Sequence, residues 1–463
     1  MPTAAPTRKQ LSSTSAPRAA ALLAVFLFLA YLANLRYIST GDTDAVRYVP
    51  FSILLDARLD VDRFIAPHLE IYKRRGMPYG VYFATQSRGH WMSSYPVLTP
   101  LVVTPLYVPA AVWVSQRQPS PRAMLFVAEA MEKLSAALIA ALSAGILYLA
   151  LRRLLPTGGA LALTLIYALA SPTWSTASQV LWLHGFTELC LALLIWALVR
   201  DDGSPRSALL TGLAIALAAA NKPTNVVTVA PVFLWMLWKS RARALPLLAP
   251  IVMIGALVFG YNLYYFGNLL GAYTQALESM GYARAASGFR GNFFEGLAGL
   301  LASPNRGLFI FVPWTLFAAW GAIRLWRNHQ HGWSRALVIG AVLHLFLYAK
   351  LERWYAGYCF GPRYMCDILP LLTFFLVPLW PALTSSRLLK PAFALAVALS
   401  FGVQVIGAYF HPNGDWSSAP VSIDVAPQRA WDWHDLQIVR TLRAGPASTR
   451  LLDHLRGKHE QQR

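Results

Sequence analysis

The chain has 463 residues, of which 56% are hydrophobic, 13% aromatic and only 13% charged. Soluble domains contain about a quarter charged residues, so this composition excludes a soluble enzyme and predicts a protein that crosses a membrane many times. The formal net charge of +19 is compatible with nucleic-acid binding, but the basic residues fall in short clusters between apolar runs, as the positive-inside rule predicts, and a nucleic-acid partner is not expected.

Residues 1–18 are polar and basic, and residues 19–38 form the first apolar run. The run has the length of a spanning helix, about 20 residues, without a clear small-residue cleavage site, so we expect an uncleaved span that follows a cytoplasmic segment 1–18. Asp42 and Asp44 follow where the chain leaves the bilayer. Acids at such a boundary are costly and often functional. The alternative is that the two acids only mark the end of the span.

Residues 39–96 are polar and are expected to form an external loop. Within it, apolar residues between Val46 and Leu59 recur at near-helical spacing, which predicts an amphipathic helix on the membrane surface. The loop is too short for an independent enzymatic domain. It is long enough to cover a cavity in the membrane domain.

The next run, residues 97–114, contains three prolines, which weaken a spanning helix. The basic clusters alternate consistently if this run is re-entrant or interfacial. If it crosses the membrane, either another run does not span or the later basic clusters fall on the wrong side. The remaining runs, together with 19–38, predict an all-α polytopic protein of about eleven transmembrane helices, with a membrane domain 19–409 and an external tail 410–463. These runs are 128–151, 158–173, 180–199, 206–221, 224–239, 245–267, 308–328, 336–350, 367–383 and 390–409.

The same topology places the chemically unusual residues on the external face. Four cations there are candidates for binding an anionic head group: Arg47, Lys222, Arg306 and Arg363. Arginines at span ends are also common as interfacial anchors. Lys222 stands in a short turn where the positive-inside rule gives no reason for a lysine, which favours contact with a phosphate. Arg306, in the turn 303–307, is as compatible with lipid head groups as with substrate.

Two further external residues complete the candidate site. Tyr364 offers an aromatic face for a sugar, and His184 is either a helix cap or a site residue. An external carboxylate, Asp42 or Asp44, is suited to accept a proton from an attacking hydroxyl. The sequence has neither a Walker-type loop nor a dinucleotide fingerprint. A transferase of this kind would therefore take its donor from the membrane, as a lipid-linked phosphate.

The pattern resembles the GT-C superfamily of polyprenyl-phosphate-dependent membrane glycosyltransferases, to which the protein O-mannosyltransferases and lipid A aminoarabinose transferases belong. The resemblance rests on the acids after the first span, on the external loop before many spans, and on short motifs. These motifs are at residues 95–100, 261–268, 303–307 and 360–364. The resemblance extends over most of the chain, but only in the architecture and in these short motifs.

The resemblance implies an inverting transfer of a hexosyl or pentosyl group from a polyprenyl-phosphate donor to a hydroxyl of a glycan, lipid or protein. Asp42 matches the family's catalytic base best, with Asp44 second. Basic residues of external loops would hold the phosphate. Thr43 separates the two acids, where many members have an adjacent pair. The base assignment and any use of a divalent cation therefore stay open, and no metal ligand is assigned.

A transporter or flippase of a lipid-linked sugar is the competing interpretation. Such proteins have charged or broken helices near the middle of the bilayer and often inverted repeats. Here the apolar runs are mostly uninterrupted, and the polar residues gather at one face, which favours the enzyme. The arginine- and alanine-rich composition suggests a bacterial inner membrane, with the site on its periplasmic side.

Overall fold

The computed structural model describes residues 15–36, 38, 40–74, 82–272, 288–327 and 332–447. Most of the predicted cytoplasmic segment 1–18 and the end of the predicted tail, 448–463, lie outside the described residues. Within these ranges most residues are helical and the strands form a single short hairpin, which confirms the predicted all-α class.

Each of the eleven apolar runs predicted from the sequence corresponds to a helical segment. These are α1 (Ser15–Leu32), α6 (Pro121–Leu151), α7 (Thr157–Leu169), α8 (Leu183–Val199), α9 (Pro205–Asn221), α10 (Val226–Lys239), α11 (Ala244–Phe266), α14 with α15 (Leu308–Phe311, Thr315–Arg327), α16 (Gly332–Ala349), α17 with α18 (Leu369–Phe375, Trp380–Ser385) and α19 (Leu389–Tyr409). In the described ranges, six helical segments are long and apolar enough to cross a membrane, and several others are shorter. The chain is a multi-pass membrane protein, and the count of eleven spans stays a prediction.

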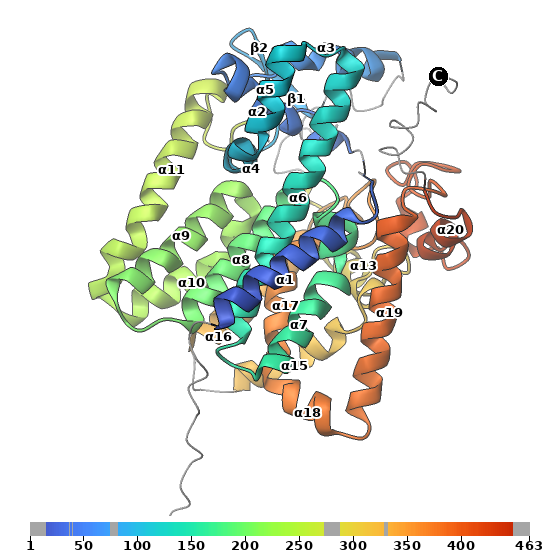
Figure 1. Ribbon diagram of the computed structural model, residues 1–463. Coiled ribbons are helices and arrows are strands. Elements are labelled where there is room, and N and C mark those ends of the chain that lie inside the picture. Colours follow the sequence, from blue (N-terminus) through green and yellow to red (C-terminus); the bar gives the residue numbers. More distant parts are fainter. Residues whose placement is uncertain are drawn as a thin grey trace, which may run out of the picture.

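Helix α6 is the axis of the bundle. Its 31 residues extend over about 46 Å, whereas the hydrocarbon core of a bilayer is about 30 Å thick. Helix α6 packs on α1, α7 and α8, and its N-terminal part reaches the 3-10 turn Val46–Tyr48 of the first loop. Figure 1 shows α6 running from the bundle into the end of the molecule that carries this loop. The helix thereby joins the membrane domain to the loop of the two candidate acids.

The first loop folds into two helices and a hairpin. Helix α2 (Val49–Asp56) confirms the helix predicted between residues 46 and 59. Helix α3 (Asp62–Arg74) and the antiparallel hairpin of β1 (Ala84–Ser87) and β2 (His90–Ser93) were not predicted. The hairpin pairs Ala84 with Ser93 and Ser87 with His90.

Residues 98–117 form α4 (Leu98–Val103), a 3-10 turn and α5 (Val108–Arg117). By length and composition this segment qualifies as a span. It packs on α2, however, and Figure 1 shows α4 and α5 at the end of the molecule that holds α2 and the hairpin. Pro105 and Pro109 stand in the first positions of the 3-10 turn and of α5, where a proline costs no hydrogen bond. The arrangement favours the interfacial placement, which stays a prediction.

The tail folds back on the loop before α14 and on the loop between α16 and α17. It contains a 3-10 turn (Pro427–Trp431) and α20 (Gln437–Arg443). Ser303 donates a hydrogen bond to the carbonyl of Ala430 (2.8 Å), and the Gln437 side chain donates one to the carbonyl of Cys359 (2.8 Å). These contacts fix the loop that leads to Arg363.

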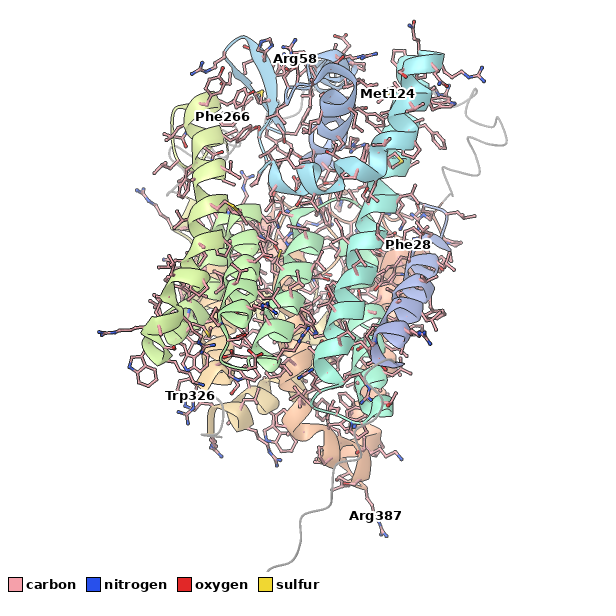
Figure 2. The ribbon with its side chains drawn as sticks, turned by 60° about the vertical axis from the view of Figure 1, so that its left-hand side comes forward. Phe28, Arg58, Met124, Phe266, Trp326 and Arg387 are labelled. Carbon is pink, nitrogen blue, oxygen red and sulfur yellow. The ribbon has the colours of Figure 1, made fainter. Side chains whose placement is uncertain are left out.

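The two ends of the bundle differ in chemistry. Figure 2 shows Trp326 and Arg387 at one end and Arg58, Met124 and Phe266 at the other. The basic clusters around residues 324–327 and 387–390 thus lie opposite the first loop. This is the separation that the positive-inside rule requires of a cytoplasmic and an external face.

Helix α16 crosses α10 at a glycine, which generates a test of the packing. A Cβ atom at Gly340 would lie 2.1 Å from the carbonyl oxygen of Thr228. We expect Gly340→Ala to force the helices apart and to cost about 1–3 kcal/mol of stability, measured as a lowered unfolding temperature in detergent. Gly402→Ala on α19 is the control, because nothing lies within 4 Å of its added Cβ. Equal unfolding temperatures for the two variants would contradict the crossing.

Candidate active site

Asp42 is held by residues from two distant parts of the chain. It stands in the 3-10 turn Gly41–Thr43, and 20% of its side chain is exposed. One carboxylate oxygen accepts a hydrogen bond from the Tyr95 hydroxyl (2.9 Å), and the other accepts one from Nη1 of Arg363 (2.6 Å). The acid after the first span, the end of the first loop and the 360–364 motif therefore meet at one point.

Arg363 opens the 3-10 helix Arg363–Ile368, and its guanidinium is enclosed by aromatic rings. It lies 4.9 Å from the ring centre of Trp182 and 5.7 Å from that of Tyr364. The preceding backbone requires a glycine, because Gly361 has φ +66° and an added Cβ would lie 2.5 Å from the Phe311 ring. This tight turn directs Arg363 toward the first loop.

A second cluster surrounds Asp367, which is completely buried. Its oxygens contact Nζ of Lys222 (2.7 Å) and Nδ1 of His184 (2.6 Å). His184 comes from the start of α8, and Lys222 comes from the turn between α9 and α10. Sequence reasoning named His184 and Lys222 but missed Asp367. In the sequence, the only feature that could have indicated a role for Asp367 was that it is a single acid at the start of an apolar run.

Aromatic rings connect the two clusters. Lys222 lies 5.0 Å from the ring centre of Tyr348, and Tyr348 packs on Tyr364 at 4.6 Å between ring centres. Tyr364 adjoins Arg363 in the chain. The structure therefore brings five of the predicted residues into one site, namely Asp42, His184, Lys222, Arg363 and Tyr364.

Asp44 and Arg47 occupy a different, buried environment. Arg47 is fully buried and pairs with Asp44 (2.7 Å), Glu129 (3.3 Å) and Glu132 (3.1 Å). Burial acts to lower the pKa of Arg47, but the three carboxylates outweigh it and raise that pKa above its ordinary value. The ion pairs of Arg47 with Glu129 and Glu132 connect the first loop to α6. Its geometry favours a structural role for Arg47 and separates Asp44 from the surroundings of Asp42.

Arg306 is also committed to structural contacts. All five of its N–H groups donate hydrogen bonds, to the carbonyls of Asn305, Tyr355 and Gly357 and to the side chains of Ser417 and Gln437. The guanidinium lies 4.8 Å from the Trp416 ring centre. Because an arginine has only five donors, Arg306 has none left for a phosphate here. It holds the tail against the loop before Arg363.

An apolar cavity of about 390 Å³ lies beside this site. It opens between α9, α11 and the end of the first loop. Its lining includes residues 93–98, Ala216, Ala219, Ala220, Pro223, Val226, Ile251, Gly255, Val258, Phe259, Tyr261, Asn262, Phe266 and 269–272. Tyr95 belongs to this lining and also binds Asp42, and Ala220 and Pro223 flank Lys222 in the chain. The cavity therefore ends at the polar site.

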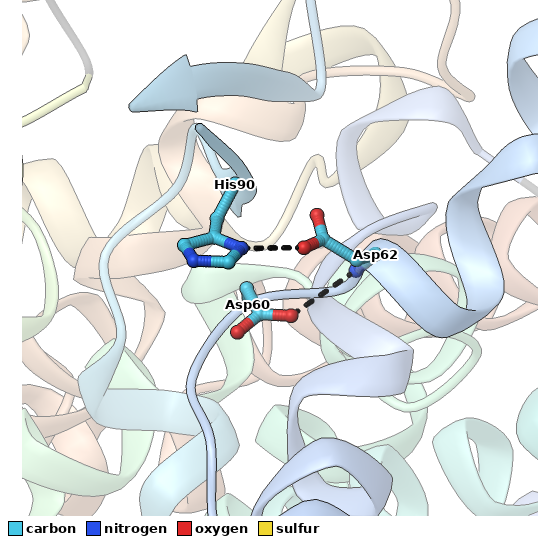
Figure 3. Close-up of side chains that lie close together, drawn as sticks. All are labelled: Asp60, Asp62 and His90. Atoms are coloured by element: carbon cyan, nitrogen blue, oxygen red, sulfur yellow. Dashed lines mark hydrogen bonds and ion pairs between the residues drawn. The ribbon is translucent and has the colours of Figure 1, made fainter. Parts of the chain in front are cut away.

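A possible metal-ligand group among the described residues lies in the first loop. Asp60, Asp62 and His90 offer ligand atoms within 4.8 Å of one another (Figure 3). His90 contacts Asp62 (2.7 Å), and Arg58 binds both Asp60 (2.6 Å) and His90 (2.8 Å). Asp62 also accepts the backbone N–H of Trp91. Because Arg58 and His90 already partner both acids, the group is explained as a latch between α3 and the hairpin.

Comparison with known proteins agrees with this architecture. The family model described as dolichyl-phosphate-mannose-protein mannosyltransferase matches residues 128–265. No curated protein matches the sequence.

Two solved structures share the fold. The chain is similar to ArnT from Cupriavidus metallidurans bound to undecaprenyl phosphate, with 14% identity and a TM-score of 0.51 over 96% of this chain and 78% of ArnT. It is also similar to the oligosaccharyltransferase AglB from Archaeoglobus fulgidus, solved with an inhibitory peptide and a dolichol-phosphate, with 13% identity and a TM-score of 0.51. That match covers 94% of this chain and 62% of AglB. The resemblance to GT-C proteins is thereby confirmed at the level of the fold.

His68 in α3 generates a pH-dependent prediction. It bonds the Tyr48 hydroxyl (2.9 Å), and burial and the charge of Arg47 lower its pKa to about 4. The unfolded chain, in which the histidine pKa is about 6.5, then binds the proton more readily. Stability from this group is complete above pH ~6.5 and is lost as the pH falls toward ~4.

We expect His68→Gln to remove about 2 kcal/mol of the stability loss between pH ~7.5 and ~5, measured by thermal unfolding at both pH values. His434→Gln, in an exposed part of the tail, is the control and should unfold like the wild type. An unchanged acid sensitivity in His68→Gln would show that other groups cause it.

Proposed function

We propose that this protein is an inverting membrane glycosyltransferase that moves a hexosyl or pentosyl group from a polyprenyl-phosphate donor to an acceptor hydroxyl at the external face. One observation carries the proposal. Tyr95 both lines the apolar cavity and donates a hydrogen bond to Asp42. A carboxylate suited to proton transfer thus stands where an apolar cavity ends.

The cavity fits the hydrocarbon part of such a donor. Its volume of about 390 Å³ is within the usual range of ligand pockets, about 300–1,000 Å³. Its wall α11 exposes much of its apolar surface, including Val252, Leu257 and Leu263, so a lipid chain can enter from the bilayer. The undecaprenyl phosphate and dolichol-phosphate in the two similar structures support a donor of this class.

Lys222 and Arg363 are suited to the phosphate of the donor. The transfer forms a bond between the acceptor oxygen and the anomeric carbon and breaks the bond from that carbon to the phosphate oxygen. The leaving polyprenyl phosphate changes from a diester to a monoester and gains one negative charge. Two cations beside that oxygen stabilise this charge as it develops. Tyr364, which packs on Tyr348 and adjoins Arg363, offers a ring face to the sugar.

Asp42 is the base in this scheme. Tyr95 and Arg363 each hold one of its oxygens, and each oxygen keeps a lone-pair site that can receive the acceptor proton. Asp44 is bound to buried Arg47 and anchors the turn. The positive partner of Asp42 is Arg363, a group of the chain itself, so no step is assigned to a divalent cation. The acceptor is a glycan, lipid or protein, and the site would face the periplasm of a bacterium.

Asp42→Asn removes the base, and we expect kcat to fall by about 10²–10⁴-fold. The measurement is transfer of radiolabel from a panel of polyprenyl-phosphate sugars by the purified protein. Asp56→Asn is the matched control, because Asp56 lies in the same loop and pairs only with half-exposed Arg63 in the described structure. If Asp42→Asn transfers sugar at the wild-type rate, Asp42 is not the base. If no donor is consumed while the protein moves lipid-linked sugar between leaflets of proteoliposomes, it is a transporter.

Gly255→Leu tests the cavity. Gly255 lines it, and nothing lies within 4 Å of an added Cβ, so the larger side chain occupies open space. We expect donor affinity to fall about tenfold or more, equivalent to about 1.4 kcal/mol, with unfolding temperature unchanged. Gly260→Leu, on the same helix but outside the lining, is the control. Equal donor KM values in both variants would place the lipid elsewhere.

A further inference from the structure

Asp367 is a buried charge that the proposed chemistry does not itself use. Its side chain is completely buried, and its two oxygens each have one partner, Lys222 and His184. An isolated carboxylate in such a place would cost several kcal/mol. The ammonium of Lys222 and the His184 ring remove most of that cost.

Stability alone does not explain this arrangement. Replacing a buried ion pair by apolar side chains of similar size is often neutral or stabilising. Its neighbours in the chain, Ile368 and Leu369, are buried apolar residues, so an apolar side chain would suit this position. A role for the charge in function is therefore the more economical explanation.

The location of Asp367 indicates what that role is. Arg363 and Asp367 belong to the same six-residue 3-10 helix. The first residue of this element binds Asp42, and the fifth binds Lys222. One short backbone segment thus sets the positions of both cations. His184 fixes the second oxygen of Asp367 and so restricts rotation of the carboxylate.

Lys222 keeps capacity to bind a ligand in this arrangement. An ammonium group has three N–H donors, and Asp367 accepts one of them. The Tyr348 ring covers another side at 5.0 Å. The side chain is 10% exposed, whereas that of Asp367 is not exposed at all. The lysine can therefore contact a substrate, and the aspartate cannot.

We propose that Asp367 is a positioning residue that holds the Lys222 ammonium beside Arg363 for the phosphate of the donor. The proposal rests on the function proposed above and deepens it. Asp367 does not touch the substrate. It acts only through Lys222, and that condition makes the proposal testable.

Asp367→Asn is the first variant. An amide has the same shape, its oxygen can accept from Lys222, and its NH₂ can donate to a neutral His184 ring, so the fold should persist. We expect donor KM to rise about tenfold and kcat to fall as well, because a misplaced lysine weakens both the binding of the donor phosphate and the stabilisation of the charge that develops on it. Glu188→Gln is the matched control. Glu188 is another fully buried carboxylate, bonded to the Tyr167 and Thr173 hydroxyls, and its variant should keep the wild-type donor KM.

A double-mutant cycle separates positioning from a general structural effect. In the Lys222→Met background, Asp367→Asn should raise donor KM no further. The Lys222→Met/Asp367→Leu pair buries no unpaired charge and serves if Asp367→Asn alone does not fold. Its donor KM should equal that of Lys222→Met. If either Asp367 substitution raises donor KM above that of Lys222→Met, Asp367 acts independently of Lys222, and the proposal is wrong.

Binding of polyprenyl phosphate without a sugar distinguishes this inference from the proposed function. The wild type should gain unfolding temperature with added polyprenyl phosphate, and Asp367→Asn should gain less at the same concentration. If the wild type binds and transfers but Asp367→Asn behaves identically, only the positioning role fails. If the wild type neither binds polyprenyl phosphate nor transfers sugar, the proposed function fails with it.

Discussion

The ion pair between Asp42 and Arg363 is the contact on which the rest of the site depends. It joins the turn after the first helix to the loop before α17, more than 300 residues later. The two sides are held independently. Arg47 anchors the turn to α6 through Glu129 and Glu132, and Arg306 anchors the Arg363 loop by donating to the carbonyls of Tyr355 and Gly357. Arg47 and Arg306, both fully buried, therefore fix the backbone on the two sides of the Asp42–Arg363 pair. Arg363 is partly exposed and is the arginine of the three that can contact a substrate.

This arrangement also relates the polar site to the membrane. Tyr95 lines the cavity and donates a hydrogen bond to the Asp42 carboxylate. Lys222 directly follows the last turn of α9, a helix that also lines the cavity. A lipid-linked phosphate has the same division into an apolar chain and an anionic head. The distribution of apolar and charged groups thus matches the two parts of the donor proposed above. Asp367 extends the same logic, because it positions a cation without contacting solvent.

Residue type and side of the membrane were enough to nominate Lys222, Arg363, Tyr364, His184 and Asp42, which meet in one site. The same criteria nominated Arg47 and Arg306, whose donors are taken by buried partners. The sequence pattern does not distinguish an arginine whose donors are free to bind a phosphate from one whose donors hold a loop in place. Asp367 escaped notice for a related reason. Its importance comes from Lys222 and His184, which lie 145 and 183 residues away.

The sequence by itself determined the all-α membrane class, the positions of the helical runs and the separation of basic from chemically unusual loops, because hydrophobicity and charge act locally on each segment. It also determined the helix of the first loop. Only the tertiary structure decided that Asp42 and Asp44 lie in different surroundings, that α3 and a hairpin build the rest of that loop, and which cations keep donors that no buried partner takes. Those outcomes depend on contacts between segments hundreds of residues apart, where burial and the number of hydrogen-bond partners settle what each charged group can do.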